Sequence, residues 1–180
     1  LIFNDADAGN PFEAGRVGRT VLSYIRRGGS APDLTWVHAS ATSTGWVWRL
    51  SGVVTTGDPE DATRSYAYDD VSPMTSTTIT TATANSAVMS VRTKRQSTTG
   101  SAPDLTERLD FSLMYVMADT QASAGATGNK NVTDSADNDN NNWLLALKEA
   151  AAGGQNKMKW GVGMGVGGPS GTNLRAGVIG

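Results

Sequence analysis

The sequence predicts a mainly β protein: an antiparallel β-sandwich or jelly-roll-like sheet with an N-terminal helix and one short C-terminal helix. Two observations carry this prediction. Short runs rich in β-branched and aromatic residues alternate with polar residues over most of the chain. Clusters of Gly, Pro, Asn and Ser separate these runs, as expected of turns. No apolar run approaches the ~18 residues that a membrane-spanning helix needs, so no membrane span is expected.

Composition narrows the class further. The 180 residues show no large break in composition, which predicts a single β-rich domain over residues 11–180. Residues 1–10, which precede the first expected helix, are expected to form an arm. The absence of Cys excludes disulfides and thiolate chemistry. A net charge of -2 argues against a chain built wholly to bind nucleic acid, while a local basic patch remains compatible with it. Only 18% of residues are charged, as in many coat, fibre and secreted β proteins.

The first elements are a helix and a hairpin. Asn10 and Pro11 are suited to the start of a helix, and an apolar stripe at helical spacing continues to Gly28, where the helix is expected to end. Residues 34–40 and 46–55 then alternate as strands. The Ser/Thr/Gly stretch between them predicts that these two strands pair as a hairpin.

The middle of the chain is dominated by a long hairpin from about residue 86 to residue 119. Before it lie an acidic loop (residues 57–73), with a short strand around residues 66–68, and a Thr/Ser-rich edge segment (residues 75–85). In the hairpin, Arg92 and Lys94 are expected on the outer face of the first strand. The return strand is expected to place Leu109, Leu113 and Met117 on one apolar face, and to become buried on both faces.

The C-terminal part is predicted to hold a helix and two strands. Asn142 is suited to cap a short helix over residues 143–152, from Trp143 to Ala152, which Gly153 would end. Residues 157–167 read as a strand in which every second residue is Gly, and residues 174–179 are expected to pair with it. The heptapeptide GSAPDLT occurs at residues 29–35 and 100–106, which indicates either a reused turn or a duplicated half-domain.

The basic-polar strand, turn and apolar return strand of residues 86–119, followed by a helix at residues 143–152, are similar in order to the coat proteins of small RNA bacteriophages. The resemblance covers only these segments and includes no diagnostic motif. The Gly-rich tail departs from it. What the resemblance implies is a virion subunit that assembles with copies of itself.

Catalytic chemistry is not indicated, and no enzyme is expected. His38 is the only histidine, and a single histidine on a strand is more often structural. The carboxylates of Asp58, Glu60, Asp61, Asp69 and Asp70 lie in the acidic loop. A glycosidase needs two carboxylates held at a fixed separation, and spacing in a loop does not supply that geometry. A solvated loop is the favoured interpretation.

Two candidate binding surfaces emerge. The first is an aromatic platform for sugar rings, for which core packing is the alternative. Its residues are Trp46, Trp48, Tyr66 and Tyr68. The second is a basic patch for phosphates or a protein partner, for which cross-strand ion pairing is the alternative. Its residues are Arg92, Lys94, Arg95 and Arg108.

No cofactor is expected, with calcium as the alternative. Asp134, Asp137 and Asp139 lie in an Asn/Asp-rich segment that supplies oxygen ligands, although the EF-hand pattern fails at Asn142 and Lys148. The alternating glycines are expected to leave one strand face bare for close packing against another sheet or subunit. They are Gly161, Gly163, Gly165 and Gly167.

Taken together, these features favour a self-assembling structural subunit, most simply a capsid, coat, fibre or filament protein located in a virion or outside the cell. Arms and bare-faced strands are suited to joining copies of one chain. The alternative is a secreted carbohydrate-binding β-sandwich module, with or without calcium.

Overall fold

The computed structural model describes residues 34–36, 43–69, 74–76, 78–94, 100–101, 104–111, 114–135, 140–150, 159–167 and 172–174. The chain forms two compact units, Leu1–Tyr24 with Val53–Ala151 and Ile25–Gly52 with Ala152–Gly180. The described residues are strands and connecting turns without a helix, which confirms the mainly β class for them. None of them belongs to a helix long and apolar enough to cross a membrane. The predicted N-terminal arm and helix lie outside these residues, and the single domain stays a prediction.

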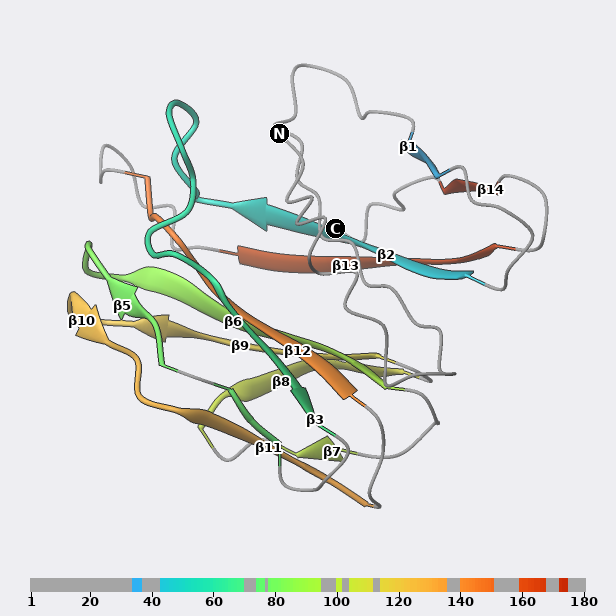
Figure 1. Cartoon of the computed structure of the whole chain (residues 1–180). Coiled ribbons are helices and arrows are strands. Elements are labelled where there is room, and N and C mark those ends of the chain that lie inside the picture. Colours follow the sequence, from blue (N-terminus) through green and yellow to red (C-terminus); the bar gives the residue numbers. More distant parts are fainter. Residues whose placement is uncertain are drawn as a thin grey trace. The chain divides into compact units, whose positions relative to one another are not determined.

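The first unit contains a five-stranded antiparallel sheet in the order β3-β12-β6-β9-β8 (Figure 1). β6 pairs with β9 from Ser86 opposite Gln121 to Thr93 opposite Met114. The predicted two-stranded hairpin is wrong in its connection, because β8 lies between these strands in the chain and pairs with the other side of β9. Residues 114–118 of β9 are all buried, which confirms a return strand covered on both faces. The strands of the sheet are β3 (Ser65–Asp69), β6 (Ser86–Lys94), β8 (Thr106–Phe111), β9 (Met114–Gln121) and β12 (Asn140–Leu147).

The return strand is nevertheless not continuous. The sequence predicts one strand through Leu109, Leu113 and Met117, whereas β8 ends at Phe111 and β9 begins at Met114. The two strands pair with each other, with Phe111 opposite Met114. Both segments are apolar and alternate, so their pattern alone does not reveal that they are two strands.

The predicted C-terminal helix is wrong, because Trp143 to Leu147 belong to strand β12. The strand lies between β3 and β6, with Trp143 opposite both Tyr66 and Val91. Residues 142–147 are all buried, and alternate ones occupy opposite faces of the sheet. A continuous apolar run is compatible with either a helix or a strand covered on both faces, and the pairing partners decide between them. The helix that formed part of the resemblance to phage coat proteins is therefore absent at residues 143–147.

Shorter strands complete the first unit. They form a three-stranded sheet, β4-β11-β7, and a two-stranded sheet, β10-β5. One core cluster joins them to the large sheet, since Val132 of β11, Ile79 and Leu105 pack with side chains from β6, β9 and β12. The short strands are β4 (Met74–Ser76), β5 (Thr80–Thr81), β7 (Gly100–Ser101), β10 (Gly125–Ala126) and β11 (Lys130–Asp134). The large-sheet members of the cluster are Val88, Tyr115, Met117, Leu144 and Ala146.

The second unit is built on a two-stranded antiparallel ribbon of β2 (Ser43–Ser51) and β13 (Lys159–Gly167). The two strands pair over their full length, from Lys159 opposite Ser51 to Gly167 opposite Ser43. A second pair joins β1 (Leu34–Trp36) to β14 (Thr172–Leu174). The predicted hairpins within residues 34–55 and 157–179 are therefore wrong for the described strands, because each strand pairs with one from the other end of the chain.

Candidate functional site

The acidic loop before β3 is held against the end of β12 by backbone hydrogen bonds. The N–H of Asp61 donates to the carbonyl of Ala146 at 2.9 Å, and the N–H of Lys148 donates to the carbonyl of Pro59 at 2.8 Å. Glu60 forms an isolated β-bridge with Leu147. The loop is therefore a fixed structural element and not the freely solvated segment that its composition suggests.

Asp61 is 5% exposed, and its carboxylate accepts three hydrogen bonds from the first residue of β6 and the turn before it. Ser86 Oγ donates to Oδ2 at 2.6 Å, the N–H of Thr83 donates to Oδ2 at 3.0 Å, and Thr83 Oγ1 donates to Oδ1 at 3.0 Å. The turn includes Asn85 at a φ of 58°, a conformation that Asn tolerates better than most residues. Burial opposes the charge, but these hydrogen bonds outweigh it and hold the pKa of Asp61 below its usual value.

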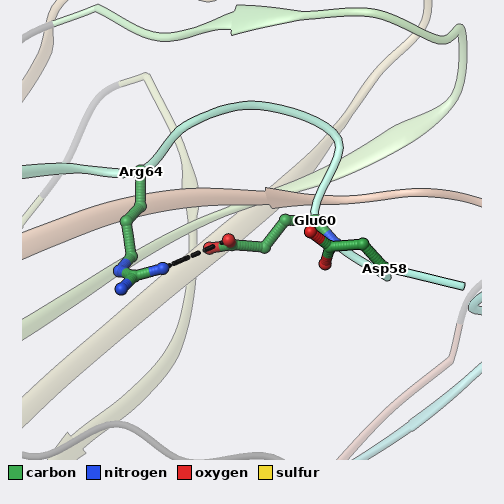
Figure 2. A network of polar contacts seen from close by, with 3 residues as sticks. All are labelled: Asp58, Glu60 and Arg64. Carbon is green, nitrogen blue, oxygen red and sulfur yellow. Dashed lines mark hydrogen bonds and ion pairs between the residues drawn. The ribbon is translucent and has the colours of Figure 1, made fainter. Parts of the chain in front are cut away.

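Glu60 forms an ion pair with Arg64, and Figure 2 shows the two side chains pointing toward each other. Arg64 Nη1 donates to Oε1 at 3.2 Å and to Oε2 at 3.1 Å. The guanidinium carbon lies 5.9 Å from the centroid of the Trp143 ring, and Tyr66 packs on the same indole with ring centroids 4.9 Å apart. Burial raises the pKa of Glu60 in spite of this ion pair.

A shallow open hollow lies at this loop, lined by Asp58, Glu60, Asp61, Ala62 and Thr63. Asp61 uses both carboxylate oxygens inside the fold, and Glu60 is paired with Arg64. The third carboxylate, Asp58, accepts the N–H of Glu60 at 3.0 Å. In the part of the chain that the structure describes, no three His, Asp or Glu side chains come close enough to hold a metal ion. The carboxylates of Asp61 and Glu60 are thus engaged in contacts within the fold.

The basic patch is not assembled as expected. Arg92 is fully buried, and its Nη1 donates to the carbonyl of Val132 at 3.0 Å. The side chain of Arg92 is therefore not exposed in this structure, and a partner surface at the basic residues stays a prediction. Lys94 ends β6, Arg108 is exposed at an irregularity in β8, and Arg95 lies outside the described residues.

The candidate aromatic residues are divided between the two units. Trp46 and Trp48 occupy alternate positions of β2, opposite Met164 and Val162. Tyr66 and Tyr68 lie on β3 of the other unit. Tyr66 is half-buried and packs on Trp143, which favours the packing interpretation for this residue.

The candidate calcium segment is only partly described. Asp134 is the last residue of β11, opposite Gly100, whereas Asp137 and Asp139 lie outside the described residues. Asn142 is a fully buried strand residue, and its Oδ1 accepts a hydrogen bond from Ser90 Oγ at 2.7 Å. Asn142 thus neither caps a helix nor lies in a loop. Calcium binding stays a prediction for Asp134 and its neighbours.

The alternating glycines Gly161, Gly163, Gly165 and Gly167 do lie on a strand, β13. Their partners on β2 are Arg49, Val47, Gly45 and Ser43. One face of the ribbon therefore carries small residues on both strands toward the end at Gly167. His38, the only histidine in the sequence, lies outside the described residues.

Two polar networks were not anticipated from the sequence: Asp61 with its turn, and Ser90 with Asn142. Both join residues far apart in the chain, and no local motif announces them. The one feature of the sequence that could have indicated the first network is that Asp61 stands next to the apolar residue Ala62, ahead of a Thr/Ser-rich stretch. That signal is common and does not identify a partner.

Comparisons of this chain with protein-family models, with curated proteins and with solved structures found no match.

Proposed function

We propose that this chain is a self-assembling structural subunit of the capsid, coat, fibre or filament type, acting in a virion or outside the cell. The observation that carries the proposal is the β2–β13 ribbon. Among the described strands, β2 and β13 pair only with each other. Each therefore has one edge, nine residues long, with which no other described strand pairs. Such an edge is a template for pairing with another chain.

The composition of the ribbon strengthens this argument. Arg49 is the only charged residue in β2, and Lys159 is the only one in β13, at its first position. Natural proteins usually block long edges with charges, prolines or bulges when pairing must be avoided. A two-stranded ribbon is also only marginally stable by itself, so further pairing or packing supports it.

The edges of the first unit contrast with this ribbon. β8 is an outer strand of the large sheet, and its pairing with β9 is interrupted between Glu107 and Leu109. Glu107, Arg108 and Asp110 add three charges to that edge. Irregular pairing and charge are the devices that discourage strand addition. The difference between the two units favours assembly through the ribbon.

For the first unit we propose a β-sandwich arrangement. The core cluster draws on one face of the large sheet and on β11 with Ile79 and Leu105. Arg92 of the large sheet also donates to the carbonyl of Val132 on β11. Two sheets that share a core in this way are the usual basis of a sandwich. A rigid unit of this kind would serve as the body of an assembling subunit.

The proposal is tested by the size of the purified full chain in solution. Sedimentation velocity over a range of concentrations should show species larger than the monomer, and negative-stain electron microscopy should show regular particles or filaments. A monodisperse monomer at high concentration, with no assemblies on the grid, contradicts the proposal.

A sugar-binding role is the second candidate, favoured by the alternate placement of Trp46 and Trp48 on β2. Residues two apart in a strand share a face, which suits stacking against successive sugar rings. Binding to a glycan array that Trp46→Ala abolishes in a folded protein would support it. Assembly without any glycan binding would favour the structural role.

A further inference from the structure

We propose that the peptide bond between Asp58 and Pro59 is a self-cleavage site, cut by the carboxylate of Asp58 while Lys148 stabilises the reacting carbonyl. The sequence contains an Asp–Pro step only here. The bond lies in the acidic loop, between strand β2 of the second unit and strand β3 of the first unit. The proposal goes beyond the proposed function, because it assigns a covalent processing step to the chain whether or not the chain assembles.

Lys148, which directly follows β12, contacts both sides of this peptide bond. Its Nζ donates to the main-chain carbonyl of Asp58 at 3.2 Å, and its backbone N–H donates to the carbonyl of Pro59 at 2.8 Å. Its own carbonyl accepts the N–H of Val54 at 3.2 Å, so the same residue also holds the start of the loop. A positive charge therefore lies on the carbonyl oxygen at which negative charge develops during cleavage.

The carboxylate of Asp58 is held across the same bond. Its Oδ1 accepts the N–H of Glu60 at 3.0 Å, so the hydrogen-bonded ring that this contact closes contains the Asp58–Pro59 peptide. Figure 2 shows this carboxylate beside the backbone of Glu60. An oxygen of this group that attacks the carbonyl carbon of its own residue closes a five-membered ring, and such an intramolecular attack gains from proximity.

The two sides of the bond differ in exposure. Pro59 is buried, and Glu60 is bridged to Leu147, so the nitrogen side is fixed to the end of β12. Asp58 is exposed and lines the open hollow at the loop, so water reaches the carbonyl side. The arrangement therefore admits the water that the reaction consumes while the contacts of Lys148 stay in place.

The reaction needs no co-reactant other than water. One carboxylate oxygen of Asp58 attacks the main-chain carbonyl carbon of the same residue, and the oxyanion that forms accepts a hydrogen bond from Nζ of Lys148. The carbon–nitrogen bond then breaks, its electron pair stays on the Pro59 nitrogen, and this nitrogen takes a proton from water. The hydroxide left behind opens the cyclic anhydride on Asp58. One water molecule is consumed, and the products are a fragment that ends in the two carboxyl groups of Asp58 and a fragment that begins with the free amine of Pro59.

Strand pairing would still join the two fragments after cleavage. Strands β1 and β2 lie in the fragment of residues 1–58, and their partners β14 and β13 lie in the fragment of residues 59–180. The cut would therefore open the loop without removing either strand of these pairs. A folded subunit could be altered in this way and remain in one piece.

Mass spectrometry of the intact full chain, incubated in mildly acidic buffer, tests the proposal. We expect fragments of residues 1–58 and 59–180 to form at a first-order rate that does not depend on the protein concentration. In urea that unfolds the chain, the bond should be cut about tenfold more slowly, because Lys148 no longer contacts the carbonyl of Asp58. Ordinary acid hydrolysis of an Asp–Pro bond predicts no such loss, since it needs no contact made by folding.

Substitutions separate the two roles in the folded chain. Lys148→Met should slow cleavage about tenfold, while Lys148→Arg should retain most of the rate through its positive charge. Lys130→Met, which removes a positive charge from β11, is the matched control and should leave the rate unchanged. Asp58→Ala should abolish cleavage, because it removes the nucleophile and leaves Pro59 in place. Circular dichroism checks the folding of each variant.

The proposal is overturned if fragments of these masses do not form, if the folded and urea-unfolded chains are cut at equal rates, or if Lys148→Met is cut as fast as the unmodified chain. Cleavage that persists in Asp58→Ala would also overturn it. None of these results bears on assembly, which is measured on the uncleaved chain.

Discussion

Replacing Asp61 tests the main polar contact that holds the acidic loop. The carboxylate accepts hydrogen bonds from Ser86 Oγ and from both the N–H and the hydroxyl of Thr83. Ser86 is fully buried, whereas Thr83 is exposed. Water therefore replaces the lost partner of Thr83 more easily than that of Ser86.

The magnitude follows from this difference. A hydrogen bond to a charged group contributes about 1.5–3 kcal/mol, and we assign this range to the Ser86 contact. The two Thr83 contacts contribute about 0.5–1 kcal/mol each, because solvent competes for them. Asp61→Ala is therefore expected to lower the free energy of unfolding by about 2.5–5 kcal/mol. Asp61→Asn, which keeps the shape and one acceptor oxygen, should cost about 1–2 kcal/mol.

The effect should depend on pH in a defined direction. The hydrogen bonds hold the pKa of Asp61 below its usual value, so the folded state favours the ionised form. Its contribution is complete above about pH 5, and is lost as the pH falls through the folded-state pKa, below the usual value of about 3.9. The stability difference between the unmodified chain and Asp61→Asn should therefore shrink as the solution is acidified from pH 7.

Urea unfolding at low protein concentration, followed by circular dichroism at a series of pH values, measures this difference. Asp58→Asn is the control, because Asp58 is exposed and, among the contacts described, its carboxylate accepts only the N–H of Glu60. This substitution should cost no more than about 0.5 kcal/mol. A gap between the unmodified chain and Asp61→Asn that stays constant with pH would refute the reasoning, as would equal effects at Asp58 and Asp61.

Three further substitutions test other contacts, each by urea unfolding. Ser90→Ala should cost about 1–2 kcal/mol, because it removes the donor to Asn142 inside the sheet; a change below about 0.3 kcal/mol would contradict this. Trp143→Ala should cost about 3–5 kcal/mol through lost packing, while Trp143→Phe should recover much of this loss, and equal costs would argue against packing. Glu60→Gln should change stability at pH 7 by less than about 1 kcal/mol. Burial raises the pKa of Glu60, so at pH 7 the cost of burying its negative charge offsets the stabilisation from the ion pair with Arg64. If Glu60→Gln lowered the free energy of unfolding by more than about 2 kcal/mol, the ion pair would dominate.

The sequence predicts the β class and several strands well. Residues 86–94 form β6 as expected, because their alternating apolar residues indicate a strand locally. The short strand around Tyr66 and the Gly-alternating strand near Gly163 are also present. These predictions succeed because the two-residue period of a strand depends only on neighbouring residues in the sequence.

The candidate site is predicted less well. Asp58, Glu60 and Asp61 do lie together in a loop, as their spacing implies. Their chemistry is decided by Ser86, Thr83 and Arg64, which supply hydrogen bonds and charge. Ser86 and Thr83 are more than twenty positions away in the sequence, and no local pattern specifies such partners.

The sequence by itself determines that this chain is β-rich, free of cysteine and low in charge, and it determines where several strands run. Only the tertiary structure decides that Trp143 to Leu147 form a strand, that β2 pairs with β13, and that Arg92 is buried. The physical reason is the same in each case. Periodicity is a local property of the chain, whereas strand partners and burial depend on segments that meet only when the chain folds.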